Sequence, residues 1–112
     1  MALHFRRSDA ADYVHISDPS VVAGDAEPLA GSWIPAEGQP ADATRVRVRP
    51  LDVFEFAAFA SAETAEARIA ACWGGVVSID GQPAEAGALV PEIVHACIAL
   101  VAEISTRPLG RS

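Results

Sequence analysis

The chain has 112 residues, and its eight basic and fifteen acidic side chains give a formal net charge of −7 at pH 7. A chain of this length fits one domain, which we expect to span residues 1–112. The negative charge repels phosphate backbones and anionic membrane surfaces, so the composition argues against nucleic acid and against a membrane as partners.

The first 44 residues are rich in Pro, Gly, Asp and Ser, which form turns. This composition predicts an irregular segment over residues 1–44, here called the N-terminal arm, with only short strands between the turns. The strand candidates are residues 13–16 and residues 32–34.

Residues 45–49 have the clearest strand pattern of the sequence. Val46 and Val48 alternate with three arginines at the period of two that a half-buried strand requires. We expect the valines to face a core and the arginines to face away from it.

Two helices are expected directly after this strand. Pro50 is tolerated in a first helical turn, and apolar residues then recur at helical spacing, so the first helix is predicted over residues 51–59. Ser61 is a candidate cap for the second helix, and the glycines at residues 74–75 should end it.

A third helix begins at Pro91 and carries a wide apolar stripe until Pro108 closes it. Residues 107–112 are predicted to form a loose tail. Together these elements predict an α+β fold, in which a small N-terminal β element with the irregular arm precedes a three-helix C-terminal part. The strand and the helices make one module over residues 45–106, with the helices packed on each other and on the strand.

The sequence offers no recognisable catalytic, cofactor or metal site. The histidines and the two cysteines do not share the spacing of a ligand set, and neither a Gly-x-Ser-x-Gly motif nor a lysine-containing phosphate loop is present. Cys72 and Cys97 are too few for a disulfide framework, and reduced thiols indicate an intracellular protein. A small enzyme that depends on His95 or Cys97 is kept as a distant alternative.

The three phenylalanines of the first helix cannot all lie on one side of it. Phe56 lies about 200° around the helix from Phe54, because each residue advances by about 100°. Either the helix is buried on two sides within the fold, or Phe56 or Phe59 forms part of an exposed apolar patch with Trp73.

The apolar stripes are more numerous than a thin, alanine-rich core needs, and this excess predicts a protein partner. A second copy of the chain is one alternative for that partner. The side chains predicted to bind it are Phe54, Phe59, Trp73, Val94, Ile98 and Val101.

Four short motifs carry a family resemblance that covers about half of the chain. They are Val46-Arg47-Val48-Arg49-Pro50-Leu51, Ala71-Cys72-Trp73-Gly74-Gly75-Val76, Asp80-Gly81-Gln82-Pro83 and Val90-Pro91-Glu92-Ile93. Their order resembles that of the tail assembly chaperones of tailed bacteriophages and prophages. The resemblance implies a non-enzymatic protein that binds the aggregation-prone tape measure chain, and also tail tube subunits, in the host cytoplasm.

An extended, Pro-rich arm beside a compact module also suits a virion structural protein that lies across neighbouring subunits. The alternative function is therefore capsid decoration or head-to-tail joining, with capsid subunits as partners and the virion as location.

Overall fold

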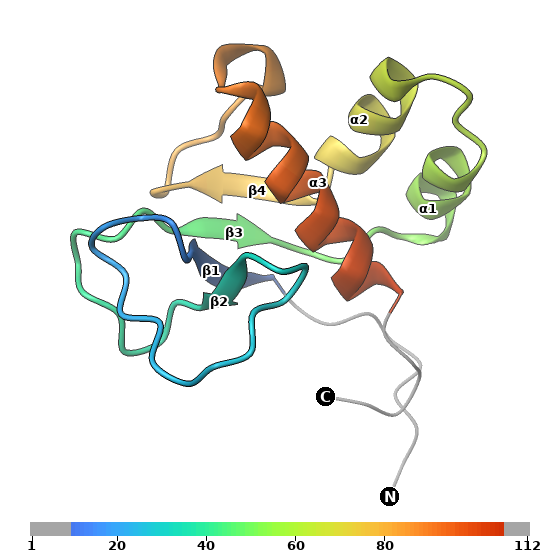
Figure 1. The fold of residues 1–112 in the computed structure, drawn as a ribbon. Coiled ribbons are helices and arrows are strands. Elements are labelled where there is room, and N and C mark those ends of the chain that lie inside the picture. Colours follow the sequence, from blue (N-terminus) through green and yellow to red (C-terminus); the bar gives the residue numbers. More distant parts are fainter. Residues whose placement is uncertain (1–9, 107–112) are drawn as a thin grey trace, which may run out of the picture.

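The computed structural model describes residues 10–106, and these form a four-stranded sheet and three α-helices (Figure 1). The α+β prediction is confirmed. The predicted tail lies outside the described residues. In chain order the elements are β1 (Ala11–His15), β2 (Trp33–Pro35), β3 (Val46–Val48), α1 (Val53–Ala60), α2 (Ala65–Trp73), β4 (Val76–Ile79), the short 3-10 helix η1 (Ala86–Ala88) and α3 (Pro91–Ser105).

The strands pair in the order β2-β1-β3-β4, and each pair is antiparallel. Within β3, Val46 and Val48 are buried while Arg47 is exposed. The predicted alternation is confirmed for these three residues, because at β3 one face of the sheet lies against the core and the other is exposed.

The described part of the N-terminal arm, residues 10–44, is built into the sheet. β1 lies between β2 and β3, and Ala11 is paired with Val48. The short strands expected in the arm are therefore found, but the expectation of an extended arm beside a compact module is wrong for these residues. The turn signals indicate local chain reversals, whereas the pairing partner of β1 lies far along the sequence.

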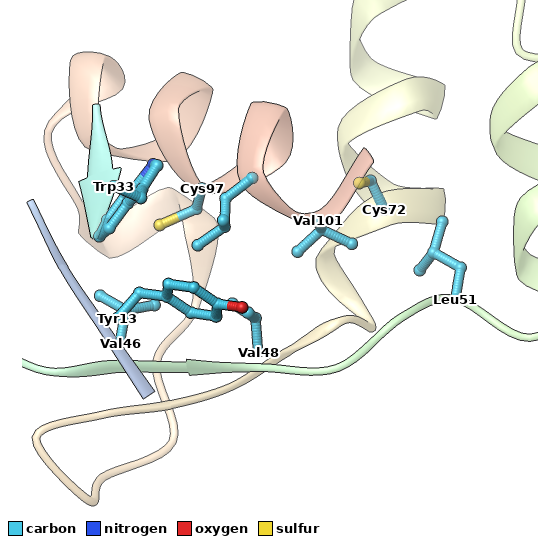
Figure 2. Packing of buried hydrophobic residues seen from close by; sticks show 9 residues of the cluster. Tyr13, Trp33, Val46, Val48, Leu51, Cys72, Cys97 and Val101 are labelled. Carbon is cyan, nitrogen blue, oxygen red and sulfur yellow. The ribbon is translucent and has the colours of Figure 1, made fainter. Parts of the chain in front are cut away.

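α3 lies across one face of the sheet and covers the main core (Figure 1). Figure 2 shows the side chains of Cys97 and Val101 pointing from α3 into this core, where Tyr13 and Val48 lie below them. The indole N–H of Trp33 donates a hydrogen bond of 2.8 Å to the main-chain carbonyl of Ala96. One core therefore joins the first strand to the last helix.

A smaller apolar cluster lies on the opposite face of β1 and β2. Val14 and Ile34 project there, and the chain that follows each strand folds back to cover them with Ala36, Ala43 and Val21. The loops on either side of β2 are thus packed against the sheet.

β4 is a strand that the sequence did not predict. Val76 and Val77 continue directly from the glycines that end α2, and the strand pairs with β3 before α3 begins. A short apolar run of this kind has no periodicity that separates a strand from a loop.

The boundary between α1 and α2 differs from the prediction. Ser61 is the C-terminal cap of α1, and its hydroxyl donates to the Ala57 carbonyl at 2.8 Å. Thr64 caps α2 by accepting a hydrogen bond from the Ala67 N–H at 3.0 Å. Ser61 therefore ends one helix and does not begin the next.

The glycines at residues 74–75 end α2 as expected, but close packing is the reason. A Cβ atom on Gly75 would lie 2.5 Å from Val101 Cγ1 and 2.9 Å from the Arg49 carbonyl oxygen. The Arg49 N–H donates to the Gly75 carbonyl at 2.8 Å. Three chain segments meet at this glycine, where no side chain fits.

Candidate protein-binding surface

α1 is an apolar helix without a buried residue. Seven of its eight residues are apolar, and the only polar one is Glu55. Phe54 is 83% exposed and Val53 is 73% exposed, the two highest values among the large apolar side chains of residues 10–106. Helices that are apolar on all sides are normally buried, so α1 departs from the usual relation between composition and burial.

The exposed side of α1 is a continuous surface, here called the α1 apolar face. Helical geometry places its members within an arc of about 160°, and Glu55, Phe56 and Phe59 occupy the remaining side. Its members are all exposed: Val53, Phe54, Ala57, Ala58 and Ala60.

Glu55 fixes the first turn of α1. Its backbone N–H donates to the Asp52 carboxylate at 2.8 Å, and its own carboxylate accepts from the Asp52 N–H at 3.0 Å, which completes a capping box. The same carboxylate accepts two hydrogen bonds from the Arg49 guanidinium, at 2.8 and 2.9 Å. This contact raises the pKa of Arg49. The two-point ion pair ties α1 to the end of β3.

Phe56 and Phe59 lie on the inner side of α1. Their ring centroids are 6.3 Å apart, and both side chains pack against the main core. The Arg68 guanidinium carbon lies 5.7 Å from the centroid of Phe59. Phe54 is thus separated from the other two phenylalanines, as the predicted angles require.

The structure does not bring the six predicted partner-binding residues to one surface. Val94 is 6% exposed and Val101 is fully buried, so the structure does not place either side chain at the surface. The apolar stripe of α3 faces the chain's own sheet, which an apolar pattern alone cannot distinguish from a partner. Ile98 is half-buried beside the same core.

Trp73 and Phe59 are also half-buried, and Trp73 donates its indole N–H to the Ala84 carbonyl at 2.9 Å. Of the six predicted residues, Phe54 alone is exposed. Sequence reasoning missed Val53 and the alanines of the α1 apolar face. A helical projection of residues 53–60 places these side chains on the same side of the helix as Phe54, and this was the signal that could have identified them.

A polar hollow of about 670 Å³ lies on the open face of the sheet, and its lining includes Asp12, Arg47 and Ser78. Arg47 donates to the Asp12 carboxylate at 2.9 and 3.2 Å, and this contact lowers the pKa of Asp12. Arg45, also in the lining, donates to three main-chain carbonyl oxygens. Both arginines therefore have partners within the chain.

The histidine and cysteine side chains of the described residues are the candidates for reactive groups or metal ligands. The Ser17 N–H donates to His15 Nδ1 at 3.1 Å, and the Ser17 hydroxyl oxygen lies 2.6 Å from the same nitrogen, within an exposed turn. Cys72 and Cys97 are buried free thiols. No group of three or more His, Cys, Asp or Glu side chains within residues 10–106 is placed to hold a metal ion.

None of the helices that the structure describes is both long and apolar enough to cross a membrane.

Comparisons with protein family models, with curated proteins and with solved structures found no match to this chain.

Proposed function

We propose that this chain is a non-enzymatic assembly protein that covers an apolar segment of another protein with its α1 apolar face. The observation that supports the proposal is that α1 is almost entirely apolar and yet has no buried residue. A surface of this kind costs solubility when it is left open, and it is characteristic of sites that bind proteins.

The sequence resemblance supplies the identity of the partner in this proposal. Tail assembly chaperones bind the tape measure chain, a long apolar protein that aggregates on its own. The net charge of −7 would keep such a complex soluble, while α1 shields part of the apolar chain. The proposed location is the cytoplasm of the phage host.

Co-expression with the tape measure protein of the same genome tests this proposal. We expect the soluble fraction of that protein to rise with the wild-type chain and to fall back with Phe54→Asp. Val22→Asp is the matched control, because Val22 is 66% exposed but lies in the loop between β1 and β2. If the wild-type chain leaves the solubility of the tape measure protein unchanged, the chaperone function is refuted.

Mass spectrometry of purified particles separates this function from the structural alternative. An assembly chaperone should be absent from finished particles, whereas a decoration or joining protein should be present in fixed copy number. The structural alternative has lost part of its support, since β1 and β2, the two strands within residues 10–44, pair in the sheet.

A further inference from the structure

We infer that the α1 apolar face binds an amphipathic helix whose apolar stripe is flanked by basic residues. This inference rests on the proposed function and specifies the chemistry of the segment that α1 covers. Two independent observations support it. Acidic residues flank α1, and the edges of the sheet are already partly paired.

Acidic side chains flank α1 along the chain, and they are here called the acidic border. Asp52 is the N-terminal cap of the helix, while Glu63 follows its C-terminal end and Glu66 lies in the first turn of α2. All three are exposed. An apolar surface with an acidic border is complementary to an apolar stripe with a basic border.

The nearby arginines do not cancel this border. Arg49 is occupied by the two-point ion pair with Glu55, and Arg68 lies over the ring of Phe59. The three acids of the border therefore outnumber Arg68, which is the one arginine within α1 and α2, and the net charge of the whole chain is also negative.

Strand addition is disfavoured because both sheet edges are already occupied in part. Beyond β4, Ile79 and Gln82 exchange two main-chain hydrogen bonds of 2.8 and 3.0 Å. Beyond β2, Trp33 and Leu29 exchange bonds of 2.9 and 2.6 Å, and Pro35 has no N–H to donate. Such blunted edges leave little room for an added strand, whereas α1 offers an apolar helix surface to a second helix.

A second copy of the chain is a poorer occupant of this face. Pairing two α1 helices would bring two acidic borders together, which is repulsive. The helix is also only about 12 Å long, so its face is small compared with the roughly 800 Å² per partner of a stable interface.

Binding of synthetic peptides to the full chain tests the inference by fluorescence anisotropy. Three labelled peptides of about 18 residues are used, long enough to form a helix. The first has a Leu/Ala stripe flanked by Lys, the second has the same stripe flanked by Glu, and the third has the composition of the first in an order without a stripe. We expect the first peptide to bind at least about tenfold more tightly than the other two.

Variants of the chain separate apolar docking from general attraction of a basic peptide. Phe54→Asp makes the surface more negative, so general attraction predicts tighter binding, whereas docking on α1 predicts a loss of about tenfold or more. Circular dichroism checks that each variant is folded. Unchanged or tighter binding by Phe54→Asp would overturn the inference.

The acidic border is tested by the double variant Glu63→Gln with Glu66→Gln. We expect it to weaken binding of the Lys-flanked peptide several-fold at low salt. The matched control is Asp25→Asn with Glu27→Gln, which removes the same charge from exposed positions in the loop between β1 and β2. Equal losses in both double variants, or equal binding of the Lys-flanked and Glu-flanked peptides, would overturn the role of the border.

The outcomes distinguish this inference from the proposed function. If no peptide binds but the tape measure protein is still solubilised in a Phe54-dependent manner, the inference fails and the proposed function stands. If the Lys-flanked peptide binds as expected but the tape measure protein is not solubilised, the proposed function fails and the inference about the binding chemistry of α1 stands. Self-association of the wild-type chain that Phe54→Asp abolishes would identify a second copy as the occupant and overturn the inference.

Discussion

Trp33 on β2 donates its indole N–H to the carbonyl of Ala96 on α3, and the two atoms are 2.8 Å apart. The bond connects the edge strand of the sheet to the helix that covers it, and the indole itself is 1% exposed. This contact makes the first third of the chain part of the main core.

Replacement of Trp33 should therefore destabilise the whole domain. We expect Trp33→Phe to lower the free energy of unfolding by about 2–3 kcal/mol, because it removes the hydrogen bond to the Ala96 carbonyl and opens a small cavity in the core. Urea denaturation followed by circular dichroism measures the change. Trp73→Phe is the comparison, since that indole is only half-buried, and an equal loss in both variants would contradict the central role of Trp33.

The close approach at Gly75 predicts that even one added methyl group is costly. Gly75→Ala should lower the free energy of unfolding by about 1–3 kcal/mol, because the new Cβ atom would overlap Val101 and the Arg49 carbonyl. Gly87→Ala is the matched control, since a Cβ atom there meets nothing within 4 Å. Thermal unfolding of both variants checks the prediction, which fails if the two midpoints shift equally.

The ion pair between Arg49 and Glu55 should hold α1 in place. Glu55→Gln is expected to cost about 1–2 kcal/mol, because the pair is partly buried and makes two hydrogen bonds. Hydrogen exchange of the Glu55→Gln variant should show a larger increase in the exchange rate, relative to the wild-type chain, for the amides of α1 than for those of the sheet. Asp12→Asn removes the more exposed pair with Arg47 and should cost about 0–1 kcal/mol, so a larger effect there would contradict this ranking.

The buried thiols predict a loss of stability at alkaline pH. Burial raises the pKa of Cys72 and of Cys97 to about 11, from an ordinary value of 9.0. Between these pH values the unfolded chain has released thiol protons that the folded chain keeps, so the free energy of unfolding falls as the pH rises from 9.0 to about 11. Urea titrations at several pH values measure the slope, and Cys97→Ala should reduce it.

The elements with strong local patterns could be predicted from the sequence, and those defined by distant contacts could not. The alternation at Val46 and Val48 and the start of α3 at Pro91 are local signals, and the structure confirms both. The central place of β1 depends on pairing with β3, which no turn signal encodes. β4 was missed because a short apolar run after two glycines fits several structures.

The candidate surface also depends on contacts between distant residues, which the sequence pattern does not encode. An apolar stripe predicts that something covers it, but it does not say whether the cover is the chain's own sheet or another protein. Val94 and Val101 are buried within the chain itself, whereas the structure leaves Phe54 exposed. Only the tertiary packing distinguishes these cases, because α1 places Phe56 and Phe59 against the main core and leaves Phe54 on its other side.

The hydrogen bond between the Arg49 N–H and the Gly75 carbonyl has a consequence for how the domain can vary. It joins the two ends of an excursion, residues 50–74, that leaves the sheet after β3 and returns directly to β4. Within the excursion only Pro50, Leu51 and Cys72 are buried. Lengthening or exchanging the helical part costs little closure entropy because its ends are already held together, so the sequence of α1 can change while the sheet and α3 keep their arrangement.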